Sequence, residues 1–290
     1  MGGYGGVGIF NKSEDNINTW HRIYPQIGIM KRDFLKEMEP LEEEEITVLT
    51  LFCGRFHTLA PYMWQLANMD YDKKKVHLVF YCTSINKYYK KLLKTAFYKI
   101  SDYYASARLV FDDSIHPSPL AYSEKSKDSD LHMENIPRLY KKAFSMVNTR
   151  YFFSLEDDQV SPSHIVKRFL RLIKIQKVAS VCGIAFDRHT DTQVPVAFDF
   201  FINPEGNRIV GEFVRDRNFC LTPVGSAGFG TTIFDKERIQ DIELTQRLDE
   251  ASDLLGCDVT FGYQANKLGR IVLVDWDVRS YHIDSTGAIC

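Results

Sequence analysis

Three consecutive carboxylates follow a short apolar run near the middle of this 290-residue chain. The run covers residues 151–155, and Glu156, Asp157 and Asp158 come directly after it. Negative charges this close repel one another where little water screens them, and a divalent cation relieves the repulsion. Oxygen ligands suit Mg²⁺ or Mn²⁺, which can bridge a diphosphate. A solvated turn or a helix N-cap uses the same residue types, so the triplet alone leaves both interpretations open.

Apolar runs of strand length alternate with helical periodicity on both sides of this triplet. The predicted strands cover residues 46–52, 76–81, 108–111, 151–155 and 179–184, and the predicted helices cover residues 58–69, 86–100, 135–146 and 163–176. This order predicts an α/β fold with a mostly parallel, Rossmann-like central sheet flanked by helices. Residues 114–132 are rich in Ser, Pro and Asp and predict a loop.

Beyond residue 190 the pattern changes to short strands and Gly-rich turns, which predicts a smaller β region. Two further helices are expected near residues 246–255 and 258–268. In an open α/β sheet, ligands bind beyond the carboxyl ends of the strands. The residues that follow the predicted strands contain no Walker phosphate loop, and a loose GxGxxG-like run at residues 3–8 follows no strand. The acidic triplet is therefore the most informative strand end.

Composition excludes several classes of protein. Charged residues make up 26% and apolar residues 44%, which is typical of a globular chain rather than a disordered one. The chain has 36 Lys and Arg residues against 38 Asp and Glu residues. It therefore lacks the excess of basic residues that is typical of proteins that bind nucleic acid. We expect no transmembrane segment and no secretory signal. The six cysteines are widely spread without a zinc spacing, which favours a reducing, cytoplasmic location.

The order of the motifs resembles that of the GT-A glycosyltransferases, particularly the family-2-like group that uses nucleotide-sugar donors. The matching segments are a nucleotide-contacting turn at residues 50–55, a DxD-type motif within 148–162, an apolar strand at 178–183, a Gly-rich segment at 225–232, a helix opened by an acidic residue at 257–269, and an apolar strand that closes on His within 270–282. The resemblance covers about residues 46–284. It implies a GT-A domain over residues 46–290, with a nucleotide-sugar-binding half to about 160, an acceptor-binding half from about 161, and an N-terminal extension over 1–45.

The resemblance also implies a metal site. Asp158 matches the last DxD carboxylate, the usual direct ligand of Mn²⁺ or Mg²⁺. Glu156 stands where the first Asp would be, which keeps the charge and lengthens the arm. Asp157 fills a position that usually holds a small residue, as a third ligand or as a neighbour of the ligands. His282 matches the histidine that closes the metal site, and a packed core histidine is the alternative.

The same resemblance implies that Asp258 is the general base of an inverting transfer. It matches one acid of the family's acidic pair, while Cys257 replaces the other. The alternative is that Asp258 only caps the helix that follows it. Without a base at this position, a retaining mechanism becomes possible.

The remaining expected contacts divide between donor and acceptor. Thr50, Phe52 and Arg55 close the first strand and are expected to contact the nucleotide, together with Glu156 and Asp157. Asp112 and Asp113 follow the third strand and are expected to bind uracil or ribose. On the acceptor side, the Gly-rich segment contributes Gly228, Phe229 and Gly230, for which a simple tight turn is the alternative.

We therefore expect a hexosyltransferase that moves a sugar from a nucleotide-sugar, with UDP favoured, to an acceptor hydroxyl. The acceptor is a glycan, a lipid, a protein or a modified nucleic acid. One alternative is a metal-dependent nucleotidyltransferase or phosphohydrolase. Another is an inactive module that binds carbohydrate or nucleic acid. The presence of Glu156, Asp158, Asp258 and His282 together favours an enzyme, because a binding module needs no such set.

Overall fold

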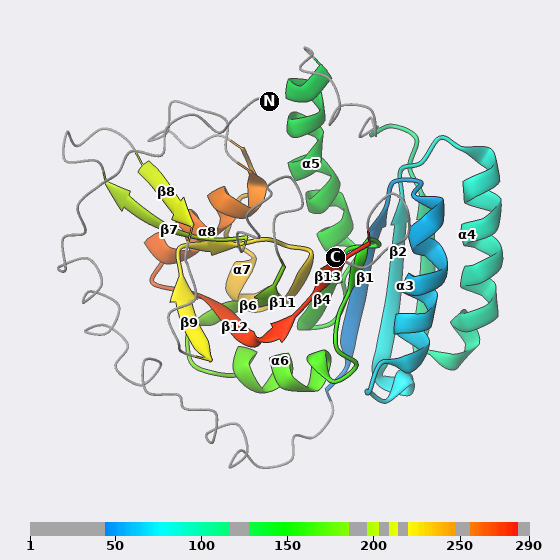
Figure 1. The fold of residues 1–290 in the computed structure, drawn as a ribbon, viewed down its shortest axis with the longest axis horizontal. Helices are drawn as coiled ribbons and strands as arrows, with labels where there is room; N and C mark the ends of the chain where they lie inside the picture. Colours follow the sequence, from blue (N-terminus) through cyan, green and yellow to red (C-terminus); the bar gives the residue numbers. More distant parts are fainter. Residues whose placement is uncertain are drawn as a thin grey trace.

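A computed structural model describes residues 44–115, 128–185, 196–202, 209–213, 220–246 and 256–283. Its centre is an eight-stranded sheet in the order β3-β2-β1-β4-β11-β6-β12-β9 (Figure 1). The strands are β1 (Ile46–Phe52), β2 (Val76–Cys82), β3 (Ser106–Phe111), β4 (Tyr151–Leu155), β6 (Val178–Ile184), β9 (Leu221–Val224), β11 (Thr231–Asp235) and β12 (Ile271–Arg279). Residues 1–43 of the expected N-terminal extension and 247–255 of an expected helix lie outside the described residues.

The prediction of a mostly parallel sheet is confirmed. β1 pairs in parallel with β2 and β4, β2 pairs in parallel with β3, and β6 pairs in parallel with β12. Because the carboxyl ends of parallel strands meet at one sheet edge, the turns after β1, β2, β3 and β4 lie along the same edge.

Three strands from beyond residue 190, namely β9, β11 and β12, belong to this central sheet rather than to the smaller β region. β11 is antiparallel to both β4 and β6, and β9 is antiparallel to β12. All five residues of β11 are buried, as expected for a strand that is covered on both faces. The smaller sheet that was expected consists of β7 (Ala197–Ile202), β8 (Ile209–Phe213) and β10 (Ser226–Ala227).

Helices cover both faces of the central sheet (Figure 1). α3 (Phe56–Asn68), α4 (Lys87–Ile100) and α6 (Ile165–Ile173) contribute to one hydrophobic cluster. α5 (Asp128–Ser145), α7 (Lys236–Ile239) and α8 (Cys257–Lys267) contribute to the other. Within the described ranges, no helix combines the length and the apolar character that crossing a bilayer requires.

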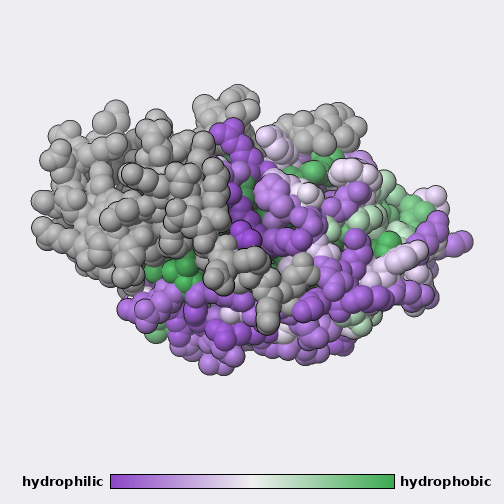
Figure 2. All heavy atoms as spheres, turned by 90° about the horizontal axis from the view of Figure 1, so that it is seen from below, coloured by the Kyte–Doolittle hydropathy of each residue, from purple (hydrophilic) through white to green (hydrophobic). Residues whose placement is uncertain are grey.

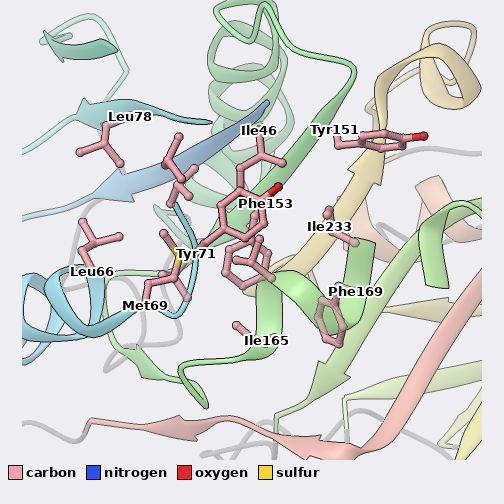
Figure 3. Packing of buried hydrophobic residues seen from close by; sticks show 14 of the residues in the cluster. Ile46, Leu66, Met69, Tyr71, Leu78, Tyr151, Phe153, Ile165, Phe169 and Ile233 are labelled. Carbon is pink, nitrogen blue, oxygen red and sulfur yellow. The ribbon is translucent and has the colours of Figure 1, made fainter. Parts of the chain in front are cut away.

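Alternation along β1 shows how one strand serves both cores. Ile46, Val48 and Phe52 join the cluster under α3, α4 and α6, whereas Leu49 joins the cluster on the opposite face. Figure 3 shows Ile46 and Phe153 next to one another in the middle of the first cluster, with Leu66 to one side of them and Phe169 to the other. Full burial of each such side chain contributes about 1.5–3 kcal/mol, so the sheet that carries the strand ends is firmly supported.

The loop expected at residues 114–132 is shorter than predicted. α5 already begins at Asp128, seven residues before the helix expected at residue 135. Asp128 and Asp130 fall in its first turn, where acidic residue types favour a helix N-terminus. The Ser- and Pro-rich composition of this stretch is typical of a loop, so the sequence did not indicate that α5 begins at Asp128. Residues 116–127 lie outside the described residues.

A buried ion pair fastens α6 to β12. Asp275 on β12 is fully buried and accepts two hydrogen bonds from the guanidinium of Arg168, one of them at 2.8 Å, and Arg168 also contacts Asp277 at 3.1 Å. Burial nevertheless raises the pKa of Asp275. β12 leads directly into β13 (Tyr281–His282), so this pair fixes the strand that delivers His282.

We predict that Arg168→Ala lowers the free energy of unfolding by about 3–5 kcal/mol, because it leaves the buried Asp275 carboxylate unpaired. Lys167→Ala is the matched control on the same helix. Its ion pair with Asp70 lies at the surface and contributes about 0–1 kcal/mol. Urea unfolding followed by circular dichroism measures both values, and equal losses for the two variants would contradict the role of the buried pair.

Candidate active site

Two carboxylates and a histidine converge beyond the carboxyl end of β4. Glu156, Asp158 and His282 each offer a ligand atom, and these atoms lie within 4.8 Å of one another. The short strand β5 (Gln159–Val160) pairs with β13, which places His282 opposite Gln159. The backbone N–H of Ile283 donates to the carbonyl of Asp158 at 2.8 Å. Residues 123 positions apart in sequence are thus held together by backbone pairing.

Gln159 connects two of these candidate ligands. Its side-chain nitrogen lies 3.2 Å from Glu156 Oε2 and 3.1 Å from His282 Nε2, and its oxygen accepts a hydrogen bond from the Thr231 hydroxyl. The opposite amide orientation would set the Gln159 oxygen against a carboxylate that only accepts, so the NH₂ group faces Glu156. His282 Nε2 is then an acceptor, which places the ring proton on Nδ1 and leaves Nε2 with a lone pair suited to a metal.

The turn after β1 supplies the positive charge for this cluster. Nη1 of Arg55 lies 2.7 Å from Asp157 Oδ1 and 2.8 Å from Asp158 Oδ2, and both carboxylates are 1% exposed. Burial, with the neighbouring Asp158 and Glu156, raises the pKa of Asp157 despite Arg55. Asp157 Oδ2 is buried and has no hydrogen-bond partner among the described residues.

These donors fit a divalent cation. Three adjacent carboxylates face one guanidinium, which leaves a surplus of negative charge in a buried place. Buried charge is tolerated only when it is compensated. Two carboxylates and one imidazole form a donor set that Mn²⁺ accepts readily, and Mg²⁺ accepts the oxygens.

Asp258 lies in the first turn of α8. Its Oδ1 accepts a hydrogen bond from the N–H of Val259 at 2.9 Å, so it does stabilise the helix start. Burial nevertheless raises the pKa of its carboxyl group. Its Oδ2 faces the Gly-rich turn, because a Cβ added at Gly228 would lie 3.9 Å from that atom. A raised pKa and a second oxygen directed at this turn suit a group that accepts a proton.

The Gly-rich turn separates Asp258 from the acidic triplet. At its other end, a Cβ added at Gly230 would lie 2.8 Å from Glu156 Oε2 and would also overlap the Gln159 amide. The carbonyl of Gly230 accepts from the N–H of Glu156 at 2.7 Å. Residues 228–230 therefore lie beside Asp258 at one end and beside Glu156 at the other, and a side chain at residue 230 would have to displace the ends of the Glu156 and Gln159 side chains.

Phe229 is a core residue. It is 4% exposed and packs edge-on against the rings of Tyr140, Phe234 and Phe261. Its side chain packs into the core and so fixes the turn. Any contact of the turn with an acceptor is therefore made by the backbone of Gly228 and Gly230.

Thr50 and Phe52 also point their side chains into the core. The Thr50 hydroxyl forms a hydrogen bond with that of Tyr62, and the Phe52 ring packs against Tyr62 and Phe80. The expected nucleotide contact at this strand end therefore rests on Arg55 and on backbone groups of the turn. Gly54 in this turn has φ +110°, and a Cβ there would overlap the Ser84 hydroxyl, so the turns after β1 and β2 touch.

Asp112 and Asp113 lie farther along the same sheet edge. β3 is three strand positions from β4, a separation of about 14 Å at the usual strand spacing. Asp112 accepts from Ser114, Tyr81 and Lys142, and these bonds hold its pKa well below its usual range. Asp113 is 68% exposed and pairs with Lys90. The structure does not bring these two residues to the cluster of Glu156, Asp158 and His282.

Sequence reasoning missed Gln159 and Thr231. Gln159 directly follows the acidic triplet, and its position was the only signal available. A glutamine indicates no particular chemistry by itself, and its role depends on partners that are far away in sequence.

No protein-family model matches the chain, and no curated protein matches it. Among solved structures, the chain is similar to the mannosyltransferase PcManGT from Pyrobaculum calidifontis, in complex with GDP-Man and Mn²⁺. The two superpose with a TM-score of 0.56 over 94% of this chain and 68% of the other, at 10% sequence identity. The chain has a glycosyltransferase fold. At this identity the likeness carries the arrangement of strands and helices, while the roles of individual residues rest on the geometry above.

We predict that Gly230→Ala weakens Mn²⁺ binding at least about tenfold, because the added methyl group displaces Gln159 and Glu156. Gly269→Ala is the control. Gly269 has φ +68° and nothing within 4 Å of an added Cβ, so this variant loses stability through backbone strain alone. Titration of Mn²⁺ followed by electron paramagnetic resonance measures both affinities. Unchanged binding by folded Gly230→Ala would show that the glycine does not make room for the ligands.

Proposed function

We propose that this protein is a metal-dependent glycosyltransferase, which moves a sugar from a nucleotide-sugar donor to an acceptor hydroxyl. The observation that carries the proposal is the convergence of Glu156, Asp158 and His282 beyond the end of β4. These residues lie at the edge of a glycosyltransferase fold where ligands of open α/β sheets bind. The GDP-Man and Mn²⁺ in the PcManGT complex support a nucleotide-sugar and a divalent ion here.

Glu156, Asp158 and His282 would hold the ion. When bound, a divalent ion neutralises the diphosphate and stabilises the departing nucleotide. Arg55 holds the Asp157 and Asp158 carboxylates in place through Nη1. Its side chain is 29% exposed, so its remaining N–H groups are available to phosphate oxygens at the open side of the turn.

Asp258 would act as the base. The acceptor hydroxyl oxygen forms a bond with the anomeric carbon while Asp258 takes the hydroxyl proton. The bond from the anomeric carbon to the diphosphate breaks, and its electron pair leaves with the nucleoside diphosphate. Attack from the side of Asp258, opposite the diphosphate, inverts the anomeric configuration. The Gly-rich turn between Asp258 and Glu156 would border the sugar, since glycine lets backbone approach it closely.

The nucleotide of the donor is a separate question from the sugar transfer. The sequence favours UDP, and the similar structure binds GDP-Man. Asp112 and Asp113 remain a prediction for the uracil or ribose contact, and no observation on the described residues favours UDP over GDP. We therefore propose a nucleoside-diphosphate sugar as the donor class. The following experiment identifies its nucleobase.

A thermal-shift screen tests the donor class. We predict that one nucleotide-sugar among UDP, GDP and CDP sugars raises the Tm when Mn²⁺ is present, because only a ligand of the folded state stabilises it. Asp158→Asn should lose this shift, whereas Asp70→Asn, which removes an exposed carboxylate, should keep it. A flat screen with folded wild-type protein would contradict a nucleotide-sugar enzyme.

Asp258→Asn tests the base. We predict unchanged donor affinity and a 10²–10⁴-fold lower rate of transfer, the usual contribution of a general base. Because burial raises the pKa of Asp258, the carboxylate is lost as pH falls through a value above 3.8, and kcat/KM of the wild type should fall with it. Retained transfer by the variant, or a product with the donor's anomeric configuration, would exclude this role.

A further inference from the structure

One segment of the chain concentrates positive charge. Residues 73–101 contain eight lysines and neither aspartate, glutamate nor arginine. Since the whole chain carries a formal charge of −2 and this segment +8, the remainder carries −10. The segment covers η1 (Lys73–Lys75), β2 and α4. The chain therefore has a strongly basic region although its overall charge is near neutral. This region includes α4, the outermost helix in the right-hand part of Figure 1.

On α4 the lysines form a solvent-facing stripe. Lys87, Lys91, Lys94 and Tyr98 recur at i, i+4, i+7 and i+11, which places them on one helix face. All four are exposed, and the three lysines pair with no acidic group in the described part of the chain. The opposite face carries the buried residues Tyr89, Leu93 and Phe97.

The neighbouring helix α3 carries no charged residue at all over its 13 residues. Its exposed positions are Phe56, Ala60, Trp64, Ala67 and Asn68, and the first four recur at i, i+4, i+8 and i+11. Trp64 is 65% exposed and Phe56 is 44% exposed. A solvent-facing helix stripe without charge is unusual, because such positions normally hold polar residues.

The two stripes belong to one outward surface, which we call the α3–α4 surface. Both helices pack into the same hydrophobic cluster and so cover the same face of the sheet. At the N-terminal ends of the two helices the Phe56 ring stacks on Tyr88 with centroids 5.9 Å apart. Of the nine large exposed apolar residues in the described ranges, seven lie between Phe56 and Phe111. In Figure 2, green apolar and purple hydrophilic residues lie next to one another on the right, where these helices are.

We propose that the α3–α4 surface docks on an anionic membrane. Exposed tryptophan and tyrosine beside lysine are the residue types that settle at a bilayer interface, with rings at the headgroup level and ammonium groups on anionic headgroups. The lysines of α4 supply the charge complementarity, and the α3 stripe supplies the apolar area.

A single-stranded nucleic acid is the competing occupant. Its binding sites combine aromatic rings with a groove that tracks the backbone, and arginine is the preferred partner of phosphate. Here the basic segment contains no arginine, and the aromatic and lysine side chains lie on two outward helix faces. These features favour a flat lipid surface. Arg55 directly precedes α3, so docking would set one rim of the site beside the bilayer.

Flotation of the full chain with vesicles tests the proposal without any nucleotide-sugar, so its outcome is independent of the proposed activity. We predict binding to phosphatidylcholine vesicles that contain phosphatidylserine, weaker binding as salt rises, and little binding to phosphatidylcholine alone. Lys87→Glu/Lys91→Glu/Lys94→Glu should lower the partition constant about 100-fold or more. The control Lys141→Glu/Lys177→Glu/Lys267→Glu makes the same change of net charge elsewhere on the surface and should bind nearly as the wild type does.

Tryptophan fluorescence provides the second measurement. Anionic vesicles should shift the emission of the wild type to shorter wavelength, and Trp64→Phe should lose most of that shift while keeping its far-ultraviolet circular dichroism. Equal loss of flotation in both lysine triples, or no shift from Trp64, would overturn the proposal. Tight binding to poly-uridylate with no vesicle binding would overturn it as well and assign the surface to nucleic acid.

Discussion

Mutual repulsion of carboxylates at the end of β4 is the constraint on which the rest of this structure depends. Glu156, Asp157 and Asp158 directly follow the fully buried strand β4, and Asp157 and Asp158 are themselves almost completely buried. Such an arrangement is stable only if positive charge and hydrogen-bond donors surround it. Arg55 provides one charge, and the Gln159 amide provides a neutral donor. A divalent cation would supply what remains.

Much of the fold can be understood as bringing those partners together. β1 runs parallel to β4 in the adjacent position, so the turn after β1 carries Arg55 to the triplet. β12 lies three strand positions from β4 and leads into β13, whose pairing with β5 delivers His282. The Arg168–Asp275 pair fastens β12 to α6. On the other side, β11 brings the Gly-rich turn between Glu156 and Asp258.

The scaffold could be predicted from the sequence because its signals are local. Apolar runs and helical spacing reproduced β1 and β4 at their bounds and placed α8 within one residue. Glu156, Asp158 and His282 were also expected together, through the order of motifs. The contacts of Arg55 with two carboxylates, and of Gln159 with His282, could not be expected. They join residues about a hundred positions apart, and no periodicity records such pairs. For Phe229 the sequence suggested a ligand contact, because the residue lies between two glycines. In the structure its ring is buried in the core and supports the turn.

Anomalous scattering from crystals soaked in MnCl₂ tests the central claim most directly, because it locates the ion without requiring an acceptor. We expect a manganese peak bounded by Glu156, Asp158 and His282, with the Gln159 side chain moved from between Glu156 and His282. A crystal with well-ordered protein at these residues and no peak there, or with its manganese bound at another site, would contradict the account.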